Sequence, residues 1–115
     1  MRVQVPSSVE QLSAVDAVSK GVLSCGDCVV VTTKNSIYSI WPLEDDTYAV
    51  VGGWFDKQSQ SPSKLRINGC TWGGTAIKHD IVAAPGLFLE FGNGVKTTRI
   101  QRVCVIRADR EGLIN

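Results

Sequence analysis

Beyond Gly21 the chain is a succession of short segments that favour β-strands, separated by residues that favour turns. Residues 27–34, for example, are rich in valine and threonine, whose branched side chains suit a pleated sheet. Glycine-containing or polar turns recur at the intervals typical of a small barrel or sandwich. Because long helices do not alternate with these segments, the pattern excludes a parallel α/β fold.

The spacing of these turns predicts roughly six to eight strands. They cover residues 27–34, 37–43, 47–55, 64–68, 75–82, 87–91 and 95–107, with the last segment broken near residues 98–99. The first three should form a meander, and Gly52 and Gly53 indicate a bulge or a close backbone approach. Closing the sheet removes exposed edges, so we expect a small, antiparallel, partly closed β-barrel. A two-sheet sandwich is the alternative.

One helix is predicted, over residues 9–19 near the N-terminus. Ser7 and Glu10 have the spacing of a capping box. Apolar residues recur at helical spacing from Val9 onward, and Gly21 is typical of a helix end. We expect this helix to cover an end or an edge of the barrel.

The length and composition predict a single domain over residues 1–115. The chain has 115 residues, 43% of them hydrophobic and 20% charged, which are ordinary values for one globular core. The expected parts are the helix at 9–19, a β body at 27–107 and a polar tail at 108–115. No secretion signal or membrane-spanning stretch stands out, so we expect a cytoplasmic location and no membrane partner.

Cysteines supply one candidate site. Cys25 and Cys28 form a C-x-x-C pair, the spacing that brings two thiolates to one metal ion or into a redox disulfide. Cys70 and Cys104 stand alone, so the spacing does not complete a four-ligand zinc site. We therefore expect reduced, mostly buried thiols and no cofactor, and keep a metal or redox site at Cys25 and Cys28 as an alternative.

No catalytic set can be assigned from the sequence. His79 is the single histidine and lacks a partner fixed by sequence spacing. Glu44, Asp45 and Asp46 fall on a predicted turn, where such a cluster is usually solvated, and Glu90 is expected to face solvent from its strand. These features do not predict an enzyme.

Two tryptophans and an uneven charge distribution point to binding. Trp54 and Trp72 each adjoin a glycine pair, where a ring can line a pocket or fill the core. Residues 61–115 carry a formal charge of +4 against −3 for residues 1–60. The basic half therefore offers candidate contacts to a phosphate backbone. The candidate ligand-binding residues are Trp54, Trp72, Lys64, Arg66, Arg99 and Arg102.

The leading hypothesis is a non-enzymatic binding or assembly module that contacts a protein partner or a second copy of itself. Single-stranded nucleic-acid binding through the basic half is one alternative, with bases stacked on the exposed aromatics. The metal or redox site is the other.

Overall fold

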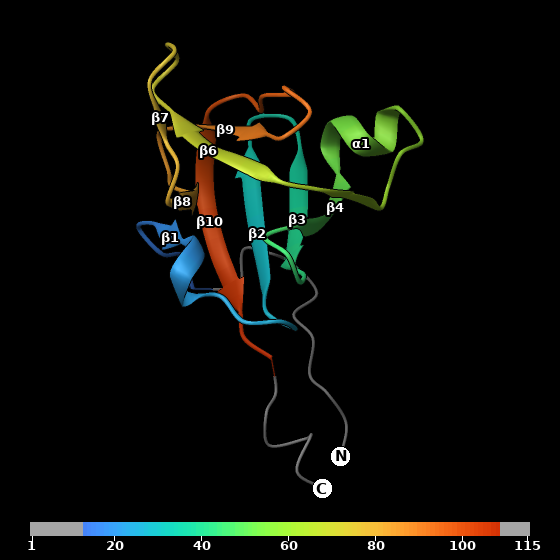
Figure 1. Cartoon of the computed structure of the whole chain (residues 1–115). Coiled ribbons are helices and arrows are strands. Elements are labelled where there is room, and N and C mark those ends of the chain that lie inside the picture. The colour runs from blue at the N-terminus through green and yellow to red at the C-terminus, as the bar shows by residue number, and fades with distance from the viewer. Residues whose placement is uncertain (1–12, 109–115) are drawn as a thin grey trace, which may run out of the picture.

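The computed structural model describes residues 13–108, and antiparallel β-sheet forms its framework (Figure 1). A five-stranded sheet has the order β10-β2-β3-β4-β5. Its strands are β2 (Cys28–Thr33), β3 (Ile37–Pro42), β4 (Tyr48–Gly52), β5 (Ser63–Leu65) and β10 (Ile100–Ile106). The expected meander is confirmed, because β2, β3 and β4 are neighbours in the sheet.

Two smaller sheets complete the framework. A three-stranded sheet has the order β7-β6-β9, with β6 (Ile67–Thr71), β7 (Ile77–Lys78) and β9 (Phe88–Phe91). Strand β1 (Val18–Ser19) pairs with β8 (Ile81–Ala83). In Figure 1, β6 and β9 cross in front of β2 and β3.

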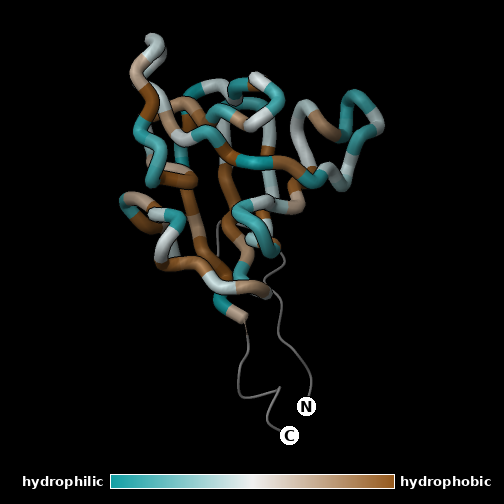
Figure 2. Tube along the Cα trace, viewed as in Figure 1, coloured by the Kyte–Doolittle hydropathy of each residue, from teal (hydrophilic) through white to brown (hydrophobic). Residues whose placement is uncertain are grey.

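Alternation along the strands builds one main core between these sheets. Tyr38 and Ile40 of β3 are buried, whereas Ile37 is exposed, as period-two side-chain placement requires. Leu89 and Phe91 of β9 enter the same cluster from the smaller sheet. Figure 2 shows the result: hydrophobic stretches follow β2 and β10, and hydrophilic residues gather at the turns.

The expected barrel is wrong: within residues 13–108 the strands form separate sheets and do not close. The free edges are short, since β5 has three residues and β7 has two. The outer edge of β10 is bridged by Ala14, which pairs with Cys104. Few backbone groups are therefore left unpaired at these edges, because the edge strands are short and one segment covers β10. Closure into a barrel is not needed for this.

The expected N-terminal helix is also wrong over its described part, residues 13–19. Ala14 bridges to β10 and Val18–Ser19 is strand β1, with Val18 buried. A short 3-10 helix follows at Lys20–Val22. Pairing with neighbouring strands therefore overrides the helical spacing of the apolar residues. The capping box and residues 9–12 lie outside the described residues, as does the predicted tail beyond Ala108.

The α-helix of the described chain lies in its middle, at α1 (Gly53–Lys57). It replaces the end of the strand predicted for residues 47–55. Phe55 draws the helix against the core: its ring is fully buried, 4.9 Å from that of Phe91 and 6.3 Å from that of Tyr38.

The strands predicted at residues 64–68 and 75–82 are each divided, the first between β5 and β6 and the second between β7 and β8. Two other expectations about the second half are confirmed. The tight turn at residues 92–94 is present, with the Phe91 amide donating to the Val95 carbonyl at 2.8 Å. The last segment is broken before Ile100, where β10 begins. Among residues 13–108, the helices are too short and too polar to cross a bilayer.

Candidate ligand-binding site

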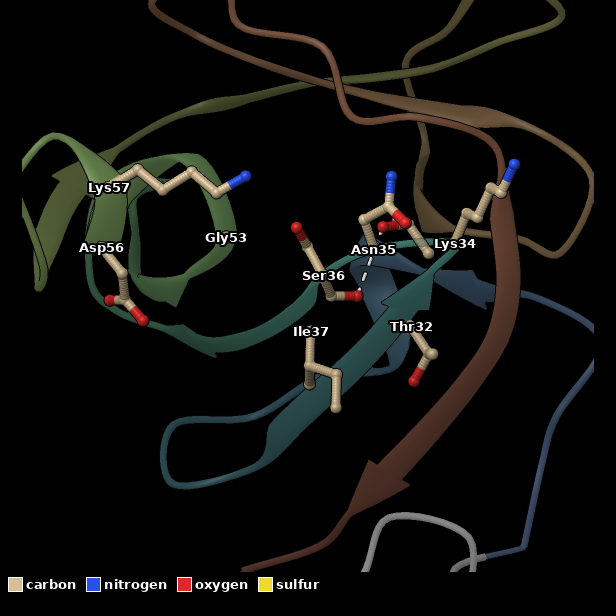
Figure 3. A pocket seen from close by; sticks show the side chains of 9 residues that line it. Thr32, Lys34, Asn35, Ser36, Ile37, Gly53, Asp56 and Lys57 are labelled. Atoms are coloured by element: carbon tan, nitrogen blue, oxygen red, sulfur yellow. Dashed lines mark hydrogen bonds between the residues drawn. The ribbon is translucent and has the colours of Figure 1, made fainter.

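A hollow of about 590 Å³ opens between the β2–β3 turn and α1 (Figure 3). A second hollow of about 190 Å³ adjoins it. The two share Thr33, Asn35, Ser36 and Lys57, and we call them together the lysine groove. The other lining residues that matter here are Lys34, Ile37, Tyr38, Trp54, Asp56, Lys96 and Thr98.

The first wall of the lysine groove is the turn at residues 34–36. The Ser36 carbonyl accepts the Thr33 amide at 2.9 Å and the Thr33 hydroxyl at 3.3 Å, which fixes the turn. In Figure 3, Lys34 and Asn35 project from this turn, and the Lys57 side chain reaches toward it from α1.

The second wall is α1, whose position depends on Tyr38. The Tyr38 hydroxyl accepts the Trp54 amide at 3.2 Å. Gly53 has φ +46° and lies against the same ring; a Cβ there would be 2.2 Å from Tyr38 Cζ. Only glycine fits this approach without displacing the ring. The close approach anticipated at the glycine pair is therefore present and sets the start of α1.

Asp56 is the acidic residue of the lysine groove, and its carboxylate is engaged within its own loop. Oδ1 accepts the Gly52 amide at 3.1 Å and the Ser61 hydroxyl. Within residues 13–108, neither Lys34 nor Lys57 has a carboxylate oxygen within 4.0 Å of its ammonium group. The groove therefore presents positive charge that the described chain does not pair.

Lys96 contributes a third cation from the segment after β9. Its ammonium lies 3.7 Å from Glu90, whose side chain is 14% exposed. Asn68 Nδ2 also donates to Glu90, at 2.7 Å. The expectation that Glu90 faces solvent is thus wrong, since these two partners hold it largely buried beside the groove.

Trp54 is the predicted binding residue that lies in the lysine groove. It is half-buried, and its ring meets the Phe55 ring edge-on at 5.2 Å. Trp72 lies elsewhere, in the β6–β7 connection, and is 62% exposed. The two tryptophans therefore do not form one stacking platform.

The four predicted basic residues lie against different neighbours. Lys64 is on β5 and Arg102 on β10, at opposite edges of the five-stranded sheet. Arg66 lines another hollow, described below. Arg99 lies 4.9 Å above the Phe88 ring and donates to the Gly86 carbonyl at 2.9 Å. Their role in binding stays a prediction.

The cysteines are all free thiols in the structure. Cys25 is exposed and Cys28 is buried; burial raises the pKa of the Cys28 thiol, partly offset by a backbone hydrogen bond at Ile40. A thiol held protonated is a poor nucleophile and a poor metal ligand. Across the described chain, no group of three or more His, Cys, Asp or Glu residues is placed to hold a metal ion. The metal or redox alternative gains no support here.

Sequence reasoning missed Lys34, Lys57 and Lys96 as a set. Each lies beside a turn or at a helix end, a position that alone indicates only solvent exposure. No protein-family model matches the chain, and neither curated proteins nor solved structures provide a match. Function is therefore inferred from the geometry of the site.

Proposed function

We propose that this chain is a non-enzymatic binding module that holds an anionic ligand in the lysine groove. The observation that carries the proposal is the pair Lys34 and Lys57. They come from separate elements, line one hollow of about 590 Å³, and have no carboxylate within 4.0 Å among residues 13–108.

The groove supplies the chemistry that an oxyanion requires. Ammonium groups act as point charges for phosphate, and the hydroxyls of Ser36 and Thr98 can add neutral hydrogen bonds. Exposed charge pairs contribute only about 0.2–1 kcal/mol each in water. We therefore expect modest affinity that falls steeply with added salt.

The direct test is a calorimetric titration of the protein with tripolyphosphate at low ionic strength. Changing Lys34→Gln and Lys57→Gln together should weaken binding about tenfold, from the exposed-pair energies above. A matched control is Lys64→Gln with Lys78→Gln, which removes the same charge outside the groove and should change affinity less than twofold. Absence of binding at low salt, or equal loss in both double variants, contradicts the proposal.

Nucleic-acid binding is a narrower form of the same proposal, favoured by the place of Trp54 in the groove. A short oligothymidylate should then bind more tightly than tripolyphosphate of equal charge. It should also quench tryptophan fluorescence, because base stacking adds to phosphate contacts. The Trp54→Phe variant should lose this quenching. Equal affinity for the two probes, without quenching, leaves an anion site that does not recognise bases.

A second candidate function is self-association through the margins of the five-stranded sheet, on the face opposite the main core. The centre of that face is buried as a second cluster of Cys28, Val30 and Cys104. Ile37 and Ile106 lie on this face and are 46% and 40% exposed. Leu43, 38% exposed, lines a hollow on it beside Trp41. Glu44, Asp45 and Lys64 line the same hollow, so its charges can pair with those of a second copy.

Light scattering after size-exclusion chromatography tests this second candidate. We expect a concentration-dependent dimer that Leu43→Lys and Ile106→Lys each disrupt. Val22→Lys is the control, because Val22 is 54% exposed but lies outside the sheet. A monomer at every concentration removes the candidate.

A further inference from the structure

A separate hollow of about 330 Å³ lies where four distant segments of the chain meet. Its polar side chains are Lys20, Asp46, Arg66, Asn68 and His79, with Ile67 at its base. This volume is at the lower end for ligand pockets, so the hollow suits a small molecule or a single chemical group.

Two of its basic groups are fixed by consecutive carbonyls of β6. Lys20 Nζ donates to the Ile67 carbonyl at 2.7 Å, and His79 Nδ1 lies 3.0 Å from the Asn68 carbonyl. A carbonyl only accepts, so Nδ1 carries a proton in this contact and Nε2 is left for another partner. Both groups are therefore oriented before a ligand arrives, which lowers the entropic cost of binding.

Arg66 adds a guanidinium directly before β6, and this group matches the spacing of oxyanion oxygens. Asp46 is the opposing charge in the hollow, so two permanent cations face one carboxylate. Glu90 lies close in the fold, but its carboxylate is engaged by Asn68 and Lys96. The hollow thus keeps a net positive charge.

We propose that this hollow binds the phosphate group of a small phosphate ester, at a site independent of the lysine groove. Lys20 supplies a positive point charge that the Ile67 carbonyl holds in place. Arg66 supplies two neighbouring N–H donors of its guanidinium group. His79 Nε2, an acceptor while Nδ1 holds the proton, can accept a hydrogen bond from the hydroxyl of a singly protonated phosphate. Asp46 limits the affinity by repelling the anion.

The test is a titration with inorganic phosphate at constant ionic strength, in which the NMR signals of the His79 ring report binding. His79 is the single histidine of the chain, so its ring signals are unambiguous. We expect a saturable shift that Arg66→Gln weakens at least fivefold and Asp46→Asn tightens about twofold. Both residues are exposed, so neither change should unfold the chain.

Controls separate a built site from general electrostatics. Lys78→Gln and Asp80→Asn make the same charge changes beside His79, at exposed positions that form their own ion pair. These controls should leave the affinity within a factor of two. Acetate should bind at least fivefold more weakly than phosphate, because it lacks the third and fourth oxygens.

Any of the following results would overturn the proposal: no saturable shift, equal effects of Lys78→Gln and Arg66→Gln, or equal binding of acetate. The Lys34→Gln, Lys57→Gln double variant distinguishes the two sites. It should leave the His79 response unchanged while it weakens tripolyphosphate binding. Loss of the His79 response in that variant would also overturn an independent site.

Discussion

The buried carboxylate of Asp27 lies 3.0 Å from Nη1 of Arg107, which joins the loop before β2 to the end of β10. Asp27 also accepts the Ser24 amide at 2.9 Å and the Ala108 amide at 2.8 Å. Arg107 Nη1 in turn donates to the Val22 carbonyl at 2.8 Å. One carboxylate therefore fastens two segments that are eighty positions apart in sequence.

We expect Asp27→Asn to destabilise the fold by about 3 kcal/mol, because an amide cannot accept all three donors and leaves a buried group badly paired. Arg107→Gln should cost only about 1 kcal/mol, since Arg107 is 52% exposed and both backbone donors to Asp27 remain. Urea unfolding of the two variants measures the difference. A loss below 1 kcal/mol for Asp27→Asn would show that the carboxylate does not hold the segments together.

Acid should weaken the same contact. Burial alone raises the pKa of Asp27, but the Ala108 and Ser24 amides and Arg107 outweigh it, so the pKa lies below its usual value. The carboxylate then contributes its full stability above the unfolded-state pKa of about 3.9. That contribution is lost as the pH falls through the lower, folded-state pKa. Urea midpoints from neutral to acid pH should decline more in wild type than in Asp27→Asn, and parallel declines would contradict this assignment.

Phe55 links the core to the lysine groove. Phe55→Ala removes a fully buried ring from a cluster with Tyr38 and Phe91, so we expect a loss of about 3–5 kcal/mol. Because α1 carries Lys57, tripolyphosphate binding should also weaken at a temperature where the variant stays folded. Phe55→Leu should show smaller changes in both. Full affinity in a folded Phe55→Ala variant would show that α1 does not need this anchor.

Glu90 is expected to restrain Lys96. Glu90→Gln keeps an acceptor for Asn68 but removes the negative charge 3.7 Å from the Lys96 ammonium. Affinity for tripolyphosphate should then rise about twofold to threefold, because the Lys96 side chain is half exposed and solvent screens the pair. Calorimetry at low salt measures the change in affinity for tripolyphosphate. Unchanged or weaker binding would place Lys96 outside the ligand site.

Local patterns were enough to predict the strands whose side chains alternate between core and solvent. The tyrosine and isoleucine of β3 have this property. Strand β2 is instead buried on both faces, and its β-branched valines and threonines were enough to predict it. The turn at residues 92–94 carries its own glycines. The helix prediction was wrong over residues 13–19 because the apolar spacing there also suits a strand. Pairing with β8 and β10 makes this segment extended. Sequence spacing alone contains no information about those partners.

The binding residues were harder to predict, because their positions depend on contacts between distant elements. Trp54 was identified from its glycine neighbours, yet Lys57 enters the same groove only because Gly53 and Phe55 turn the chain into α1. Charge counts drew attention to residues 61–115, whereas two of the three groove lysines precede them. The charge count identifies Arg66 only as part of the basic half, whereas the fold places it in one hollow with Lys20 and His79.

The most direct test for an anion site in the lysine groove is to map backbone amide NMR shifts during a tripolyphosphate titration. We expect saturable shifts at residues 34–36, 53–57 and 96–98, with those of Lys57 largest and all of them reduced in the Lys34→Gln, Lys57→Gln variant. Shifts spread evenly over the other basic residues, with none concentrated at these three segments, would contradict it.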